Sequence, residues 1–298
     1  MNDIAATKTF SEDTAISGSH LKTIFQVFLV VVCTSSLMAG TVWGMKKWLL
    51  KNFNVRAAEL TKRVQGQSQE YVDNHIQALS SFAPVFQNTE TPTQEQFSTQ
   101  AASIMSQNSG FTSINMINRD FIIDYVYPLE LNRTALHMDI KSRFDVLPVA
   151  HRAVSQHEMT STDIIDLVQG GRGIILFQPI YKDNRWIALV EGVFKIDDFT
   201  TNFIGKYLLS AHDYTVIDET NGQEIYTSLP PTSYERATPY DTYFTLKVAD
   251  RTWWVILHPQ SPPIQVFPIA GVLLLELAGG ALILFLTLRN KTALPANA

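Results

Sequence analysis

The chain has 298 residues, of which 46% are hydrophobic and 17% are charged, and its formal net charge is −5. This composition excludes an intrinsically disordered protein, and the acidic balance argues against a nucleic-acid-binding protein. A single cysteine, Cys33, excludes an internal disulfide, a cysteine-based zinc site and a CxxC redox centre.

Two strongly apolar segments lie near the ends of the chain. Residues 24–45 carry no charge, and a bilayer core needs about 20 helical residues, so this segment predicts a transmembrane helix. A cleaved signal peptide is the alternative, but the preceding leader is long and no A-x-A cleavage pattern follows. Residues 264–288 form a second predicted span, interrupted only by Glu276. We expect residues 1–23 and 289–298 to be short cytoplasmic tails.

The large loop between the spans, residues 46–263, is the expected working part. We expect a two-pass protein of the inner (plasma) membrane with this loop in the periplasm. The positive-inside rule by itself favours the opposite topology, because five basic residues flank the spans on the loop side and three on the tail side. A domain of this length, however, is translocated largely regardless of charge. The basic stretch 46–63 predicts a collar that contacts lipid headgroups.

The loop begins with the collar and a long stalk helix, assigned together to residues 46–92. Apolar residues recur at helical spacing from Leu60 to Phe82, and this stripe packs either on its own domain or on a second copy of the chain. After a break, Thr91 and Pro92 predict the N-cap and first residue of another helix.

The remainder of the loop alternates short strands with turn residues. Hairpins are predicted around residues 118–120, 170–172 and 221–222, with one of the strands at 162–167. The pattern indicates an α+β fold, in which a long stalk helix carries two antiparallel sheet units. The distal unit is assigned to residues 93–195 and the membrane-proximal unit to residues 196–263.

No catalytic motif is present in the sequence. There is no G-x-S-x-G, H-E-x-x-H or phosphate-binding glycine loop, and the seven histidines are scattered, so we expect no enzyme, no cofactor and no metal site. Glu276 lies near the middle of the second span, beside the small residues Gly279 and Gly280. These three residues predict a contact with another helix, in this chain or in another integral membrane protein, and a proton relay is the alternative.

Several pieces between Gly110 and Phe199 resemble a known family. They are GFTSINMINRD (110–120), YVYPLELNRTALHMDI (125–140), the alanines at 150 and 153, LVQGGRGIILFQPIY (167–181) and GVFKIDDF (192–199). In order and spacing they resemble the CHASE domain, the extracytoplasmic sensory module of bacterial, plant and amoebal receptors. The resemblance implies that the stalk helix carries two PAS-like units.

The resemblance also implies a ligand pocket in the distal unit. Mapped onto this sequence, its ligand-binding residues are Tyr127, Glu130, Asn132, Thr162, Phe177, Pro179, Tyr181 and Gly192. An ordinary structural interpretation stands beside this one, in which Asn132 is a turn residue and Phe177 and Tyr181 pack in the core. The family usually has glycine where this chain has His137, so we expect an altered loop beside the pocket.

Two functions of different class follow. CHASE receptors carry a cytoplasmic effector, whereas only residues 289–298 follow the second predicted span. We therefore expect a membrane-anchored sensor that binds a small ligand and signals through a separate membrane partner. The alternative is a non-catalytic accessory or scaffold subunit of a larger membrane complex. An open polar pocket favours the sensor, and a pocket filled by the protein's own side chains favours the scaffold.

Overall fold

The computed structural model describes residues 18–86, 92–208, 212–230, 238–260, 271, 275 and 277–283. The chain divides into two compact units, Asn54–Pro262 and a second unit made of Met1–Phe53 with Pro263–Ala298. Most of the second predicted span, including Glu276, and the tail after it lie outside the described residues. The predicted division of the loop at residue 195 stays a prediction.

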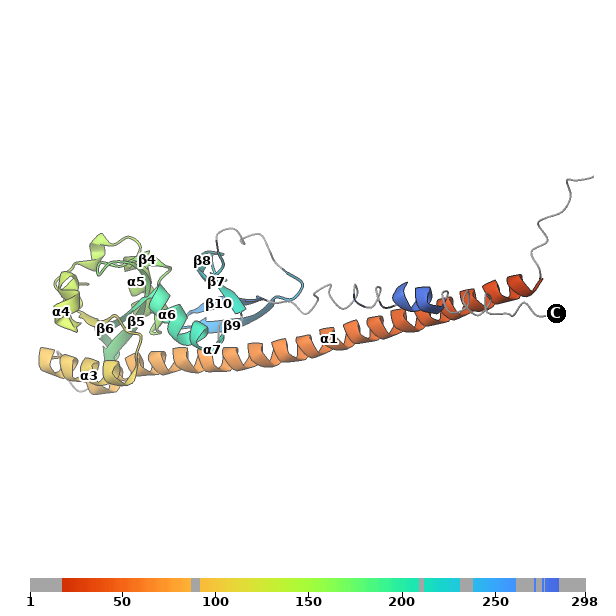
Figure 1. Ribbon diagram of the computed structural model, residues 1–298. Helices are drawn as coiled ribbons and strands as arrows, with labels where there is room; N and C mark the ends of the chain where they lie inside the picture. Colours follow the sequence, from red (N-terminus) through yellow and green to blue (C-terminus); the bar gives the residue numbers. More distant parts are fainter. Residues whose placement is uncertain are drawn as a thin grey trace, which may run out of the picture. The chain divides into compact units, whose positions relative to one another are not determined.

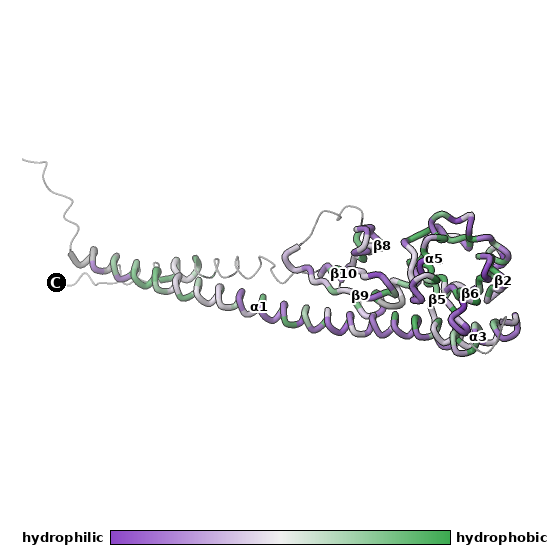
Figure 2. Tube along the Cα trace, turned by 180° about the vertical axis from the view of Figure 1, so that it is seen from behind, coloured by the Kyte–Doolittle hydropathy of each residue, from purple (hydrophilic) through white to green (hydrophobic). Residues whose placement is uncertain are grey.

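The first helix, α1 (Gly18–Ser80), runs without interruption for 63 residues (Figure 1). Figure 2 shows that its first part is hydrophobic and its later part hydrophilic. Among the described residues, one helical stretch, Phe25–Phe86, is long and apolar enough to cross a membrane, and its most apolar window is not buried within the protein. The hydroxyls of Thr34 and Ser36 donate to carbonyls four residues earlier, which satisfies them in apolar surroundings. The first predicted span is thus an apolar helix, consistent with a membrane anchor.

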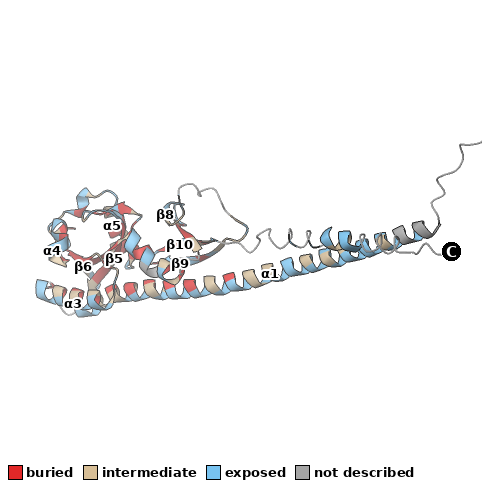
Figure 3. Cartoon of the chain, viewed as in Figure 1, coloured by how far each residue is buried: buried red, intermediate tan, exposed pale blue. Residues whose placement is uncertain are grey.

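Within the Asn54–Pro262 unit, α1 turns a buried stripe toward the sheets (Figure 3). Val64, Val72 and Leu79 on this stripe are fully or almost fully buried. The stripe recurs about every seven or eight residues, which keeps it on one face of the helix. Of the two predicted arrangements, packing on its own domain is therefore the one observed.

Two further helices follow α1: α2 (Phe82–Phe86) and α3 (Gln94–Gln107). The N-cap of α3 is Thr93, so the prediction of Thr91 is wrong by two residues. The Thr93 hydroxyl accepts from the Gln96 N–H at 3.3 Å, and the Gln96 side chain accepts from the Thr93 N–H at 3.1 Å. This reciprocal capping box satisfies two helix-end donors, which explains why the helix begins after Thr93.

The distal sheet has six antiparallel strands in the order β2-β1-β6-β5-β3, with β4 also paired to β5. The strands are β1 (Ser113–Ile117), β2 (Ile123–Tyr127), β3 (Thr160–Ser161), β4 (Ile165–Asp166), β5 (Arg172–Lys182) and β6 (Arg185–Lys195). The predicted hairpins are confirmed. The strand predicted over 162–167 is wrong as a single element, because the chain leaves the sheet between β3 and β4.

Both faces of the distal sheet are covered. On one face α1, α2 and α3 pack over Ile114, Leu176 and Phe194. The opposite face carries Phe177 and Leu189 beneath a layer of short helices. These helices are α4 (Leu129–Asn132), η1 (Arg133–Ala135), η2 (Ile140–Ser142) and α5 (Leu147–Gln156). We call the first the stalk face and the second the loop face.

The second sheet has four antiparallel strands in the order β8-β7-β10-β9. Its strands are β7 (His212–Asp218), β8 (Glu224–Thr227), β9 (Thr242–Val248) and β10 (Arg251–Pro259). It is reached from β6 through the helical segments α6 (Ile196–Thr200), η3 (Thr201–Gly205) and α7 (Lys206–Leu208). Gly222 adopts a φ of 71° in the β7–β8 turn, as the Asn-Gly pair predicts.

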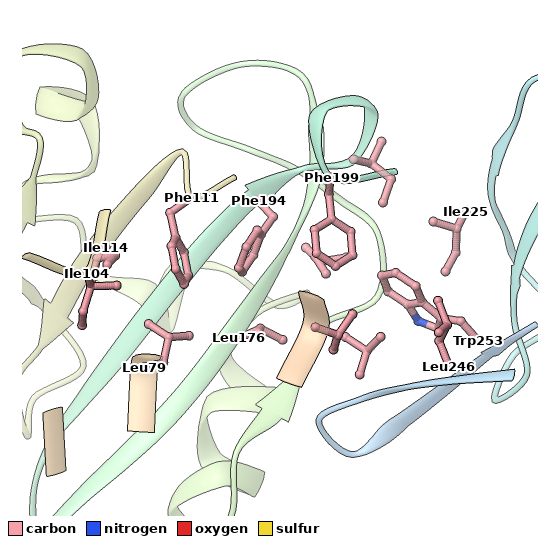
Figure 4. Close-up of a cluster of buried hydrophobic side chains, with 14 of the residues drawn as sticks. Leu79, Ile104, Phe111, Ile114, Leu176, Phe194, Phe199, Ile225, Leu246 and Trp253 are labelled. Atoms are coloured by element: carbon pink, nitrogen blue, oxygen red, sulfur yellow. The ribbon is translucent and has the colours of Figure 1, made fainter. Parts of the chain in front are cut away.

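A single hydrophobic cluster links the two sheets (Figure 4). Its aromatic rings follow one another across the unit: Phe111 to Phe194 at 4.6 Å between centroids, Phe194 to Phe199 at 5.1 Å, and Phe199 to Trp253 at 5.7 Å. Because Phe194 lies in β6 and Trp253 in β10, the two sheets share one core along α1.

The exposed edge of the second sheet is closed by glutamine side chains from α1. The Gln69 side chain donates to the Lys247 carbonyl at 3.0 Å and accepts from the Lys247 N–H at 2.9 Å, and Gln65 donates to the Thr245 carbonyl. Four residues of helix rise about 6 Å and two of a strand about 6.8 Å, so the two spacings nearly match. The ladder satisfies edge groups that would otherwise pair with another chain.

Candidate functional site

A small cavity lies on the loop face of the distal sheet. Its volume is about 10 Å³, enough for one water molecule. Most of its wall is apolar, and three polar side chains complete it: Arg143, Gln169 and Glu191. The floor comes from β5 and β6, and the walls come from η2, the start of α5, β4 and the residues that follow β4.

Glu191 is the buried carboxyl group at the base of this cavity. It lies in the middle of β6, directly opposite Asn115 of β1, and its exposed fraction is 3%. The Asn115 side-chain amide donates a hydrogen bond to Glu191 Oε1. Burial raises the pKa of Glu191 to about 7, against the smaller lowering effects of this hydrogen bond and of Arg143. The group therefore titrates near neutral pH.

Arg143 supplies a positive charge at the cavity wall. Its Nε and Nη2 atoms donate to the two carboxylate oxygens of Asp145 at 2.9 and 2.6 Å, and Nη2 also donates to the Asp166 carbonyl at 3.0 Å. The bond to Arg143 lowers the pKa of Asp145, which keeps that carboxylate charged. In the described part of the chain, Glu191 forms no ion pair within 4 Å, so Arg143 acts on it only through space.

Two buried amide oxygens near this face have no hydrogen-bond partner among the described residues. They are the Oδ1 atoms of Asn115 and Asn132. The Asn132 amide nitrogen donates to the carbonyls of Thr112 and Pro128, at 3.2 and 3.0 Å. An unsatisfied buried acceptor is costly, so each of these oxygens is an acceptor that a bound donor group would satisfy.

Six of the eight residues that the family resemblance assigned to a pocket lie on the loop face or near it. Phe177 is fully buried in the loop-face cluster, and Asn132 is buried at the end of α4. The Thr162 hydroxyl accepts from the Ile175 N–H at 3.0 Å. The Tyr181 hydroxyl donates to the Val154 carbonyl of α5. None of these four lines the cavity.

Of the other four assigned residues, Tyr127 and Gly192 face the stalk side, whereas Pro179 and Glu130 lie on the loop side but outside the cavity. Tyr127 packs against the stalk-face cluster. A side chain added at Gly192 would meet Leu79 at 2.6 Å and Phe111 at 2.7 Å, so this glycine allows β6 to approach α1 closely. Pro179 is buried in β5 opposite Leu189 of the loop face, and Glu130 is exposed at the start of α4. A ligand-binding role for the eight stays a prediction.

The backbone at His137 shows how this chain accommodates a histidine where the family usually has glycine. Its backbone has a φ of 66°, in the left-handed region that glycine adopts without strain. The loop before η2 therefore has the conformation that glycine favours, and the histidine side chain adopts it with some backbone strain.

The sequence signal for the cavity residues was a charge inside an apolar strand. Glu191 interrupts the run WIALVEGVF, and a buried acid in such a strand is expected to have a partner or a function. Asn115 in SINMI is a similar, weaker signal. Arg143 had none, because its position beside the cavity depends on how the loop folds over the sheet.

The predicted helix-partner residues fall in the second unit. Glu276 lies outside the described residues. At Gly279 and Gly280 an added side chain would meet nothing within 4 Å, so both positions leave room for another helix. Within the described residues, no group of three His, Cys, Asp or Glu side chains is placed to hold a metal ion.

Comparison with known proteins identifies the fold. A family model described as the CHASE domain matches residues 54–226. No curated protein matches the chain. The ligand-binding domain of a Pseudomonas aeruginosa amino acid chemoreceptor, solved with GABA, has a TM-score of 0.52 and 12% identity over 67% of this chain and 98% of its own.

Two further solved structures are similar. The ligand-binding domain of a Pseudomonas fluorescens chemoreceptor, solved with L-serine, has a TM-score of 0.54 and 12% identity over 70% of this chain and 97% of its own. An extracellular ligand binding receptor from Desulfohalobium retbaense has a TM-score of 0.56 and 14% identity over 68% of this chain. This chain spans only 40% of that receptor. At these identities the similarity shows the fold, which is that of extracellular sensory domains.

Proposed function

The chain belongs to the CHASE domain family, whose match covers more than half of its length, and we propose that it is an extracytoplasmic sensor of a small ligand. In this proposal the apolar part of α1 anchors the sensor in the inner membrane, with the Asn54–Pro262 unit in the periplasm. The ligand binds at the distal cavity. The signal passes to a separate integral membrane protein, which the second predicted span contacts through Glu276, Gly279 and Gly280.

The observation that carries the proposal is Glu191, an ionisable group that is fully buried beside a cavity with no ion-pair partner among the described residues. A strand position that only needed packing would be expected to hold an apolar residue. Perturbed carboxyl groups in cavities are typical of functional sites. GABA and L-serine, named for two of the structural relatives, each carry a protonated amine and a carboxylate.

The charges around the cavity suggest the chemistry of the ligand. Glu191 can accept from a protonated amine, and Arg143 can donate to a carboxylate. Pockets for small molecules usually have volumes of about 300 Å³ or more, so the wall has to move outward to admit one. We therefore expect a small amine or amino acid that binds with a rearrangement of the residues around β4.

A thermal-shift experiment on the full chain in mild detergent tests the proposal. The probes are the free amino acids and GABA. Each is added at up to about 10 mM, which is 100 times a Kd of about 0.1 mM. A ligand at 100 times its Kd stabilises the protein by about 2.7 kcal/mol, which raises Tm by about 5–10 °C for a unit of this size. No shift with any probe would contradict the proposed ligand class.

Variants then locate the site. Glu191→Gln should abolish the shift, whereas Glu158→Gln, an exposed glutamate after α5, should leave it unchanged. Glu130→Gln distinguishes the two candidate locations, because the family resemblance assigns Glu130 to the pocket and the cavity does not include it. Loss of the shift in Glu130→Gln alone would move the site to the α4 loop.

One observation favours the alternative, an accessory or scaffold subunit. The cavity holds about 10 Å³ because its own side chains fill it, and a filled pocket is what a scaffold would show. Extraction of the native protein in mild detergent, with identification of the co-purifying chains, tests this. A partner in fixed ratio, together with no response to any probe ligand, would support the subunit. Recovery as a lone homodimer would contradict it.

A further inference from the structure

Two arginines connect the turn between β9 and β10 to the distal sheet. Arg152 of α5 donates through Nε and Nη2 to Asp250 Oδ2 at 3.0 and 2.7 Å, and the Ser161 N–H donates to Asp250 Oδ1 at 2.7 Å. Arg251, the next residue, donates through Nε to Asp218 Oδ2 at 2.6 Å and through Nη2 to Asp163. The second sheet is thus held to the residues between β3 and β4.

Arg251 is the buried member of this cluster. Its side chain is 9% exposed and that of Asp218 is 4% exposed, whereas Asp163 reaches solvent. Asp218 fixes the buried guanidinium within the second sheet, so Arg251 stays paired when Asp163 moves and the bond to Asp163 pulls on a held side chain. A displacement of Asp163 is therefore transmitted to the first residue of β10.

The other end of the same segment reaches the cavity. Ile165, Leu167 and Gln169 line the cavity wall, and Arg143 holds the Asp166 carbonyl. Asp163 and Asp166 are three residues apart, at most about 11 Å in extended chain. One short segment is thus held by Arg143 at the cavity and by Arg251 at the second sheet.

We propose that residues 163–169, the relay segment, couple the distal cavity to β10, the last described strand before the second predicted span. The trigger rests on the proposed function: a ligand of several heavy atoms has to push the wall outward, and a ligand carboxylate at Arg143 competes with the Asp166 carbonyl. The relay segment then shifts, and Asp163 pulls on Arg251. The ligand signal thereby reaches β10 as a displacement of its first residue.

A double-mutant cycle without any ligand tests the coupling. Arg143→Met releases the Asp166 carbonyl at the cavity, and Asp163→Asn weakens the connection to Arg251 at the other end. The measurement is amide hydrogen exchange of residues 251–258 in the full chain in detergent. We expect Arg143→Met to change the exchange rate of this strand about threefold or more, and to have no such effect in the Asp163→Asn background. Asp183→Asn, in the β5–β6 turn, is the control and should leave the Arg143→Met effect intact.

The cycle separates coupling from a merely structural role. If the two substitutions act independently, their effects on the exchange rates of β10 multiply, and that result would overturn the relay. An unchanged exchange rate of β10 in Arg143→Met would also overturn it. If circular dichroism shows that Arg143→Met is unfolded, Arg143→Gln takes its place. Because no ligand is used, failure of every probe in the thermal-shift experiment would refute the proposed sensor and leave this cycle informative.

Discussion

Replacement of Glu191 by glutamine should stabilise the protein above neutral pH and have little effect in acid. Burial raises the pKa of Glu191 from 4.5 to about 7, so the folded state holds this proton more tightly than the unfolded state. The stabilisation that comes from this tighter proton binding is fully present below pH 4.5 and is lost as the pH rises through about 7. The difference of about 2.5 pH units corresponds to about 3 kcal/mol. Glutamine keeps the shape, accepts the same hydrogen bond from Asn115 and has no charge to bury.

The assay is thermal unfolding of the wild type and of Glu191→Gln between pH 5 and pH 8.5. We expect similar Tm values at pH 5 and a Tm for the variant that is about 5–10 °C higher at pH 8.5. Glu158→Gln, which replaces an exposed carboxylate, should follow the wild type across the range. A difference between wild type and Glu191→Gln that stays constant from pH 5 to pH 8.5 would refute the raised pKa.

Three further predictions follow from the same structure. Gly192→Ala should lower the unfolding free energy by about 1–3 kcal/mol, because the new methyl group meets Leu79 and Phe111 of the core; an unaffected stability with lost ligand binding would instead indicate a pocket residue. Thr93→Ala should cost about 1 kcal/mol through loss of the α3 cap, measured by urea unfolding, and an unchanged midpoint would argue against the capping box. Binding of an amine near pH 7 should release a proton from Glu191, seen by calorimetry as a binding enthalpy that depends on the ionisation enthalpy of the buffer; identical enthalpies in phosphate and Tris would exclude this.

Much of the fold could be predicted from the sequence because its signals are local. The Asn221-Gly222 pair requires a tight turn, and the residues 118–120 separate two apolar runs, so the hairpins follow from turn chemistry. The stalk helix follows from an apolar stripe without proline. The sequence misplaces the start of α3 because Thr91 and Thr93 are equally good N-caps by type, and only the reach of Gln96 decides between them.

The candidate site could be predicted only in part because both faces of the distal sheet are buried. On a strand that is apolar throughout, alternation no longer tells which residues face which layer. Gly192 and Glu191 are neighbours in β6, yet one faces α1 and the other the cavity. For the same reason the sequence does not reveal that Tyr127 packs on the stalk face. Arg143 reaches the cavity from a loop whose path depends on contacts with the sheet.

The most direct test of the central claim is a crystal structure of residues 54–262 with the probe that gives the largest thermal shift. These residues form a compact unit, which suits them to expression without the apolar segments at either end. We expect ligand density between Glu191 and Arg143, with residues 163–169 displaced outward. Density elsewhere in the unit, with the cavity unchanged at Glu191, would contradict the claim.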